Sequence, residues 1–315
     1  MNDGPLIASG STHPALASAI AAHLGTDTAR IRFNRFSNEN LKVCVESNVR
    51  DRDVYVVQTS CPPVNESLME TLLLIDALRG ASAGRVTAVL PYFPYVRSDK
   101  QDEPGVSITA RLVADLLVTA GAQRLIAMDL HSPQIHGFFR VPVDHVTAVP
   151  VLGRALGAGG AVQRVVVATD IGEAKDAGRF AASLGVDLAV IDKRRTGDDE
   201  HAVPRALVGD VRGRHALIVD DEIATGGTIV EAAELVMRLG AASVEAAAVH
   251  GVLCGKALER IRSSPLQRVL VTDSIPLTDA KRDPRIEVVS IAGLLADTIG
   301  RTHRGESVAD LASHR

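Results

Sequence analysis

The stretch from Ala216 to Glu231 combines the residue types of a phosphate site with a pair of carboxylates. Its first four residues, Ala216–Val219, are apolar and predict a strand buried on both faces of a parallel sheet. The segment Thr225-Gly-Gly-Thr228 then offers backbone N–H groups and hydroxyls where a helix must begin, and helix N-termini attract anions. Asp220 and Asp221 are placed to accept hydrogen bonds from hydroxyls of the molecule that carries the phosphate. A polyol phosphate, such as a pentose phosphate, suits both halves of the stretch.

An ordinary strand–loop–helix turn is the competing interpretation, with the hydroxyl of Thr225 or Thr228 as the N-cap. The apolar positions that follow keep helical spacing until Gly240, which predicts a helix over residues 229–239. Two adjacent aspartates followed by Thr-Gly-Gly-Thr exceed what a cap requires. We therefore favour the phosphate site.

Metal-binding residue types follow two further predicted strands. Asp129 and His131 come directly after residues 125–128, and on extended backbone they would point the same way and could share a metal or a phosphate. A structural role for this pair is the alternative. Asp170 follows residues 165–168 and adds a carboxylate suited to a hard cation such as Mg²⁺. Both positions lie where α/β sheets bind ligands, at the carboxyl ends of strands.

Three adjacent cations, Lys193-Arg194-Arg195, follow the predicted strand 188–191. Such a cluster is costly unless an anion lies opposite it, and residues 196–201 are rich in polar residues. We predict a lid that delivers positive charge to a transferring phosphoryl group, with a solvated loop as the alternative.

Two polar loops that contain aromatic residues suit a nucleotide. Phe36-Ser-Asn-Glu-Asn40 pairs a ring for stacking with amide side chains, and residues 91–100 include Arg97 and Lys100, which suit phosphates. Neither loop identifies a nucleotide site by itself. The chain lacks the GxxxxGK[ST] loop of Walker-type sites, the GxGxxG of dinucleotide dehydrogenases and the GxSxG of hydrolases.

Composition narrows the class of protein. The 315 residues suggest about two domains. Hydrophobic residues make up 46% of the chain but aromatics only 3%, so the cores consist of aliphatic side chains and offer little surface for stacking nucleic-acid bases. The formal net charge of −4 also argues against a nucleic-acid partner.

The cysteines and the N-terminus indicate the compartment. Cys44, Cys61 and Cys254 are far apart and form no CxxC pair, which predicts a reducing environment and no zinc site. Residues 1–5 lack the features of a signal peptide, and no apolar run reaches the roughly 18 residues that span a membrane. We expect a soluble cytoplasmic protein with no membrane partner.

Strand-like apolar runs alternate with helical patterns almost throughout, which predicts an α/β fold of parallel sheets with helices on both faces. The clearest predicted strands are residues 54–58, 86–90, 125–128, 165–168, 188–191, 216–219, 246–249 and 269–271. The predicted helices are residues 67–79, 108–120, 173–183 and 229–239.

The chain also repeats itself. Residues 110–131 can be laid over residues 229–250 without gaps, so that Gly121 falls on Gly240 and His131 on His250. We interpret this as two similar α/β domains from a duplication, which divide near residue 145; chance similarity of Ala-rich segments is the alternative. Paired domains of this kind place ligands in the cleft at the carboxyl ends of their strands.

Together these loops resemble the phosphoribosyl pyrophosphate (PRPP) synthetase family, also called ribose-phosphate diphosphokinases. The resemblance covers nearly the whole chain and implies two tandem phosphoribosyltransferase-like domains, residues 1–145 and 146–315. The segments around His131 and Lys193 are highly specific, whereas the Asp-Asp loop also occurs in phosphoribosyltransferases. The matching segments are residues 36–38, 65–77, 85–95, 128–139, 191–195, the loop that begins at Asp220, and residues 302–311.

The resemblance implies transfer of the diphosphoryl group of ATP to the C1 hydroxyl of ribose 5-phosphate, which gives PRPP and AMP and requires Mg²⁺. It also implies a homo-oligomer, a hexamer in the family, in which a neighbouring subunit completes the ATP site. The implied roles are nucleotide binding by Phe36, Asn38, Asn40, Arg97 and Ser98; metal binding by His131 and Asp170; stabilisation of the transferring group by Lys193 and Arg195; and binding of the sugar phosphate by Asp220, Asp221, Ala224, Thr225, Gly226, Gly227 and Thr228.

Several positions depart from the pattern of the family. Asn40, Ser98, Glu173 and Ala224 stand where the family has Glu, Gln, Gly and Asp, and Asp176 lies near a position that is usually basic. Residues 196–200 are acidic where the family's lid is rich in Pro and Arg, and residues 101–106 lack the arginines of its regulatory loop. An added carboxylate near transferring phosphates costs electrostatic stabilisation unless a cation compensates.

Three interpretations follow. We favour an active but diverged diphosphokinase, because His131, Asp170, Lys193 and Arg195 are all present. Such an enzyme has either the usual or an altered nucleotide or sugar-phosphate specificity. The second interpretation is a catalytically weak regulatory subunit associated with a PRPP synthetase. A phosphoribosyltransferase is the third interpretation, although such an enzyme would need only one domain of this kind.

Overall fold

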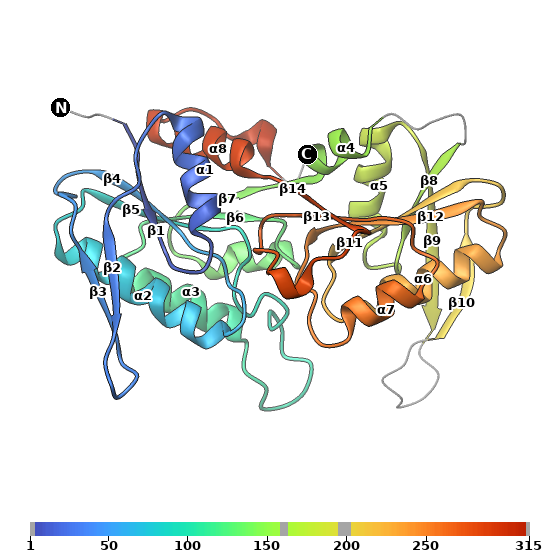
Figure 1. Cartoon of the computed structure of the whole chain (residues 1–315), viewed down its shortest axis with the longest axis horizontal. Helices are drawn as coiled ribbons and strands as arrows, with labels where there is room; N and C mark the ends of the chain where they lie inside the picture. The colour runs from blue at the N-terminus through green and yellow to red at the C-terminus, as the bar shows by residue number, and fades with distance from the viewer. Residues whose placement is uncertain (1–3, 158–162, 195–202, 313–315) are drawn as a thin grey trace. The chain divides into compact units, whose positions relative to one another are not determined.

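The computed structural model describes residues 4–157, 163–194 and 203–312, and these form two compact units (Figure 1). Unit 1 consists of Met1–Thr147, Ser274–Pro276 and Ile291–Arg315. Unit 2 consists of Ala148–Asp273 and Leu277–Ser290. Each unit is built around a mainly parallel sheet with helices on both faces, which confirms the predicted fold class.

The sheet of unit 1 has five strands, all paired in parallel. Helices α1 and α8 lie on one of its faces, and α2 and α3 on the other (Figure 1). A hairpin of two strands, β2 and β3, stands apart from the sheet. In spatial order the strands are β1 (Leu6–Ser9), β4 (Asp53–Val57), β5 (Arg85–Leu90), β6 (Arg124–Met128) and β7 (Val143–Val146). The other elements are α1 (Pro14–Leu24), β2 (Ile31–Arg35), β3 (Leu41–Val45), α2 (Val64–Gly80), α3 (Thr109–Ala120), η1 (Pro133–Phe138), α8 (Ala292–Arg304) and η3 (Ala309–Leu311).

The sheet of unit 2 has seven strands, of which only β10 at one edge is antiparallel to its neighbour. Helices α4 and α5 cover one face, and α6 and α7 the other (Figure 1). In spatial order the strands are β10 (Val203–Val208), β9 (Asp187–Arg194), β8 (Arg164–Ala168), β11 (His215–Glu222), β12 (Ser243–His250), β13 (Val269–Thr272) and β14 (Ile286–Val289). The helices are α4 (Val149–Leu156), α5 (Ala174–Leu184), α6 (Gly227–Arg238), α7 (Ala257–Ser263) and η2 (Asp279–Lys281).

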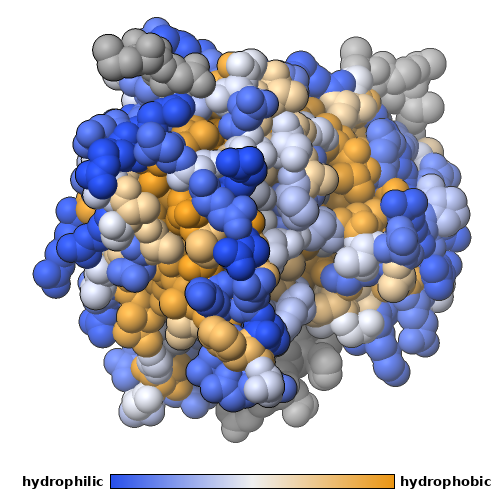
Figure 2. Space-filling view, turned by 60° about the vertical axis from the view of Figure 1, so that its left-hand side comes forward, coloured by the Kyte–Doolittle hydropathy of each residue, from blue (hydrophilic) through white to orange (hydrophobic). Residues whose placement is uncertain are grey.

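All eight predicted strands and all four predicted helices are present. Their centres are apolar because both faces of each sheet are covered; Val54, Val56, Val165 and Val167, for example, are completely buried. None of the helices in the described ranges has both the length and the apolar character needed to cross a membrane. On the face shown in Figure 2, hydrophobic residues gather in several patches divided by hydrophilic ones.

The strand order corrects the predicted alignment of the internal repeat. The order β8-β11-β12-β13-β14 in unit 2 matches the order β1-β4-β5-β6-β7 in unit 1, and a parallel bridge from Ile7 to Thr28, just before β2, mimics the pairing of β8 with β9. Helices α1 and α5 have 11 residues each and end at left-handed glycines, Gly25 and Gly185. The element of unit 1 that corresponds to α6–β12 is therefore α2–β5.

The alignment of residues 110–131 with 229–250 is thus displaced by one helix–strand step. It pairs α3–β6 with α6–β12 because each of these segments is an Ala-rich helix, a glycine and an apolar strand. The same pattern occurs in another helix–strand step, α5–Gly185–β9, so the residue types alone do not show which steps correspond. The topology does show it, through the order of neighbours in the sheet.

Two helices pack in the unit that does not contain the strand before them. Helix α4 follows β7 of unit 1 but packs on α5 in unit 2, and α8 follows β14 of unit 2 but packs on α1 in unit 1. His303 of α8 is bound to unit 1 through a contact of 2.7 Å between its Nδ1 and Oδ2 of Asp53. The division into residues 1–145 and 146–315 stays a prediction; the packing adds that residues 291–312 belong with unit 1.

Candidate functional site

The acidic pair of unit 2 lies inside a strand rather than in the loop after it. We expected the strand to end at Val219, but β11 continues to Glu222, with Asp220 opposite Ala248 and Glu222 opposite His250 of β12. Each aspartate also accepts a hydrogen bond from the next N–H group: Oδ1 of Asp220 at 2.9 Å and Oδ1 of Asp221 at 2.7 Å. Strand β11 and these two hydrogen bonds therefore set the positions of both carboxylates.

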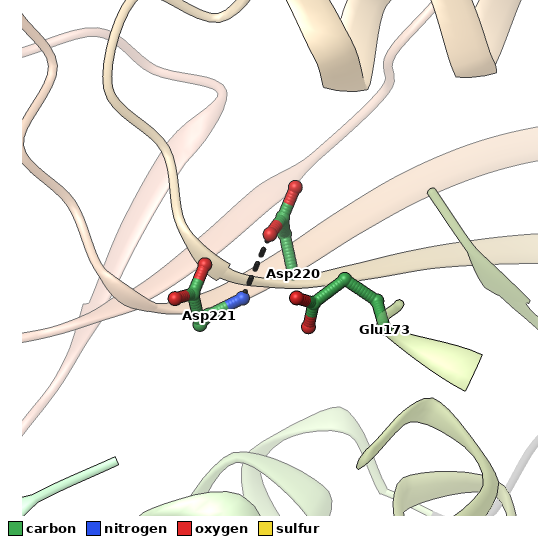
Figure 3. A group of neighbouring side chains, drawn as sticks. All are labelled: Glu173, Asp220 and Asp221. Carbon is green, nitrogen blue, oxygen red and sulfur yellow. Dashed lines mark hydrogen bonds between the residues drawn. The ribbon is translucent and has the colours of Figure 1, made fainter. Parts of the chain in front are cut away.

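A third carboxylate joins this pair. Oxygens of Glu173, Asp220 and Asp221 all lie within 4.8 Å of one another, and Figure 3 shows Glu173 reaching toward the two aspartates from the loop before α5. Strands β8 and β11 are neighbours in the sheet. The loop that follows β8 and carries Glu173 therefore lies beside the end of β11, which carries the two aspartates. The sequence marked Glu173 as a departure from the family; its place beside the aspartates depended on the order of the strands.

The cluster changes the ionisation of Asp220. Removal from water, followed by the charges of Asp221 and Glu173, raises the pKa of Asp220 well above its usual range. The hydroxyl of Thr169, which is buried, donates to Oδ2 of Asp220 at 3.3 Å. A cation placed among these oxygens would offset their repulsion, and carboxylate oxygens are the ligands that Mg²⁺ prefers in proteins.

The start of α6 has the form expected of an anion site. Gly226 is the N-cap residue, in the left-handed conformation with φ 74°, and no side chain caps the helix within the part of the chain that the structure describes. The predicted alternative, with Thr225 or Thr228 as the N-cap, is therefore wrong. Both threonines are exposed, and the backbone bond from Val230 N–H to the Gly226 carbonyl (3.2 Å) opens the helix. Donors of the first turn are left for a ligand.

Asp170 lies in the same unit, between β8 and α5. Its Oδ1 accepts the N–H of Glu173 at 3.1 Å, so the carboxylate shapes the turn that carries Glu173. Lys193 lies near the end of β9, where it is paired with Pro204 of β10. Arg195, the other predicted cation of the lid, falls outside the described residues, as do residues 196–202.

In unit 1, Asp129 and His131 follow β6 as predicted, but not on extended backbone. Asp129 has φ 36°, which lies in the left-handed region, and the expectation that the two side chains point the same way loses its basis. The bend buries Leu130, whose N–H donates to Nε2 of the buried His145 at 2.9 Å. Oδ1 of Asp129 accepts the hydroxyl of Thr147 at 2.7 Å, while His131 is exposed.

The predicted nucleotide residues lie on two loops of unit 1. Phe36, Asn38 and Asn40 share the tip of the β2–β3 hairpin, where Phe36 N–H donates to the Asn40 carbonyl at 2.9 Å. The ring of Phe36 is 53% exposed, as a stacking surface requires. Arg97 and Ser98 lie between β5 and α3, and the Ser98 carbonyl accepts the N–H of Ala110 at 3.1 Å.

Comparison with known proteins covers both halves of the chain. A family model described as the N-terminal domain of ribose phosphate pyrophosphokinase matches residues 6–121, and one described as the phosphoribosyl synthetase-associated domain matches residues 195–313. The ribose-phosphate pyrophosphokinase of Deinococcus radiodurans is 45% identical over 311 residues, which cover 97% of each chain. That of Caldanaerobacter subterraneus is 44% identical over 310 residues, 97% of this chain and 96% of the relative.

A solved structure agrees with these relatives. The crystal structure of phosphoribosylpyrophosphate synthetase from Mycobacterium smegmatis superimposes with a TM-score of 0.90 at 41% sequence identity. The match covers 96% of this chain and 99% of that one. The two chains thus share one architecture over nearly their whole length.

Proposed function

The chain belongs to the ribose-phosphate pyrophosphokinase (PRPP synthetase) family, and on that premise we propose that it forms PRPP from ATP and ribose 5-phosphate. The C1 hydroxyl oxygen of the sugar bonds to the β-phosphorus of ATP, the bond from that phosphorus to the α-phosphate oxygen breaks, AMP leaves and the hydroxyl proton is released. The observation that carries the proposal is identity of 44–45% with ribose-phosphate pyrophosphokinases over 97% of the chain. The alternative, a catalytically weak regulatory subunit associated with a PRPP synthetase, is not favoured by these relatives.

The sugar phosphate is assigned to unit 2. Its phosphate group lies against the first turn of α6 and the loop Ala224–Thr228, where the helix has no side-chain cap. Asp220 and Asp221 accept hydrogen bonds from the ribose hydroxyls. The uncapped donors and the carboxylates at the end of β11 support this arrangement, because a pentose phosphate presents an anion at one end and hydroxyls at the other.

We propose that the metal is Mg²⁺. His131 and Asp170, which the sequence suggested, remain proposed ligands. The clustered oxygens of Glu173, Asp220 and Asp221 are also of the kind that Mg²⁺ prefers. Mg²⁺ supplies charge neutralisation for the phosphates of ATP. Lys193 and Arg195 add positive charge where it develops on the transferring group, and Phe36, with Arg97, holds the nucleotide.

We also propose that the protein acts as a homo-oligomer in the cytoplasm. Large apolar side chains are exposed on the outer faces of neighbouring helices in unit 1: Met69 of α2 is 54% exposed and Leu112 of α3 is 50% exposed. Exposed apolar groups on adjacent helices are typical of protein interfaces. Light scattering coupled to size exclusion tests this assignment, and a monomer at micromolar concentration would contradict it.

The experiment that tests the reaction is an end-point assay. The purified protein is incubated with Mg²⁺, ribose 5-phosphate and each nucleoside triphosphate in turn, and the products are identified by mass spectrometry. We expect AMP and PRPP, and a change of preferred nucleotide would trace to Asn40 and Ser98. Replacing Lys193 with Ala should abolish turnover while binding of ribose 5-phosphate persists. Failure to form a nucleoside monophosphate with any nucleotide would refute the proposal.

A further inference from the structure

The loop between β11 and α6 is held from one side by residues 253–260, a segment that the sequence did not single out. Three successive carbonyls of the loop accept hydrogen bonds from this segment. They are the carbonyls of Ile223, Ala224 and Thr225, which accept from the N–H of Leu253, the N–H of Cys254 and Nη1 of Arg260, each at 2.9 Å.

This pattern sets the direction of the donors. In a trans peptide the N–H group points away from the carbonyl of the same peptide unit, and within the described residues only the bond from Pro62 to Pro63 is cis. The N–H groups of Ala224, Thr225 and Gly226 therefore point away from residues 253–260. Successive N–H groups on one side of a turn form a concave site for anions, here directly before α6.

Arg260 is the one side chain among these three donors, and it holds the least constrained peptide. Gly226 follows that peptide with φ 74°, and glycine adopts positive and negative φ with similar ease, so a reversal of the peptide meets little resistance from Gly226 itself. On the other side, a Cβ on Gly226 would lie 3.4 Å from Cα of Ala257. Helix α7, which carries both Ala257 and Arg260, thus supports the loop.

The positive charge of Arg260 lies beside the end of a helix that is itself positive. Its Nη1 lies 3.4 Å from the position that a Cβ would take on Gly227, at the N-terminus of α6, where the helix dipole is also positive. Two residues later, Arg262 pairs with Oδ2 of Asp283 at 2.7 Å, whereas no carboxylate within the described ranges pairs with Arg260. A cation at the positive end of a helix is stabilised when an anion binds beside it.

We propose that Arg260 is a positioning residue of the sugar-phosphate site. It holds the peptide between Thr225 and Gly226 so that the Gly226 N–H faces the phosphate, and its charge raises the positive potential there. The inference rests on the proposed function, since the phosphate is taken to be that of ribose 5-phosphate.

The test uses the full chain and three variants: Arg260→Gln, Arg260→Lys and, as a matched control on the same helix, Arg262→Gln. Calorimetry with ribose 5-phosphate in the absence of ATP gives Kd, steady-state kinetics gives KM for each substrate, and thermal unfolding checks the fold. Loss of a hydrogen bond from a charged donor corresponds to a rise of roughly 10-fold to 100-fold in Kd.

We expect R260Q to raise Kd and KM for ribose 5-phosphate by that factor, while KM for ATP stays at the wild-type value and the melting temperature changes no more than it does in R262Q. R260K should recover part of the affinity, because it keeps the charge but not the planar fork of donors. R262Q should bind as the wild type does. Wild-type affinity in R260Q, equal losses in R260Q and R262Q, or equal increases of both KM values would each overturn the inference.

The calorimetric arm separates this inference from the proposed reaction. If the wild type binds ribose 5-phosphate but makes no PRPP, the reaction is wrong while the comparison of R260Q with R262Q still decides the role of Arg260. If the wild type does not bind ribose 5-phosphate, both the site and the role of Arg260 are refuted.

Discussion

Replacing Glu173 with Gln should stabilise the protein at neutral pH in the absence of divalent cations. The substitution keeps the shape of the side chain but removes the negative charge of one of three carboxyl groups whose oxygens lie within 4.8 Å of one another. Coulomb's law at that separation gives about 1 kcal/mol in water and about 3 kcal/mol at the effective dielectric constant of a protein surface. We therefore expect the free energy of unfolding to rise by about 1 to 3 kcal/mol. Each kcal/mol corresponds to a rise of about 2 to 4 °C in melting temperature.

The gain should depend on pH. The pKa of Asp220 is raised in the folded protein, so ionising it costs stability; that cost is absent below the ordinary value of 3.8 and complete only above the raised pKa. The advantage of E173Q should accordingly grow as the pH rises from about 4 toward 8. Added Mg²⁺ should reduce the difference in melting temperature between E173Q and the wild type, because the wild type has more negative charge for the cation to offset.

Thermal unfolding followed by circular dichroism in EDTA, at pH 5 and pH 8, measures this effect. Glu231→Gln is the matched control, since Glu231 is exposed on α6 and its replacement removes the same charge outside the cluster. A melting temperature at pH 8 that falls in E173Q, or that rises equally in E231Q, would show that the charge of Glu173 adds nothing to the cost of ionising the buried Asp220.

Two further substitutions test how α8 is attached and how the loop before α6 is shaped. Asp53→Asn should lower the free energy of unfolding by about 2 to 3 kcal/mol, because Asp53 accepts hydrogen bonds from charged Arg85. These bonds, with those from His303 and Tyr55, outweigh the effect of burial and lower the pKa of Asp53, so the difference measured by urea unfolding should shrink as the pH falls below 3.8. Gly226→Ala should cost about 1 to 2 kcal/mol, since its φ of 74° is strained for any residue with a Cβ. It should also raise KM for ribose 5-phosphate more than KM for ATP, and equal changes in both would count against the loop as the phosphate site.

The strands of both sheets were predictable because burial on two faces leaves continuous apolar runs. Val165, Val166 and Val167, for example, are all fully buried in β8, and a short run of β-branched residues is typical of a strand inside a parallel sheet. Several strands and helices in which apolar and polar residues are mixed were not predicted from the sequence. The strands of the β2–β3 hairpin are only partly buried, and the amphipathic pattern of α8 did not reveal that the helix packs on the unit at the other end of the chain.

The candidate site was predictable where neighbours in sequence form it, and not where the fold brings distant segments together. The loop from Asp220 to Thr228 is local, and its glycines and threonines indicate an anion site without knowledge of the rest of the chain. Glu173 joins Asp220 only because β8 and β11 are neighbours in the sheet. Arg260 reaches the Thr225 carbonyl from 35 residues away, and no spacing rule predicts that contact.

The central claim is that ATP transfers an intact diphosphoryl group to the sugar. The most direct test follows the products of wild-type turnover by ³¹P NMR, starting from ATP, ribose 5-phosphate and Mg²⁺. We predict AMP and PRPP in equal amounts, with the new diphosphate attached to C1 of the ribose. Formation of ADP with a singly phosphorylated C1, or of free diphosphate without PRPP, would contradict the claim.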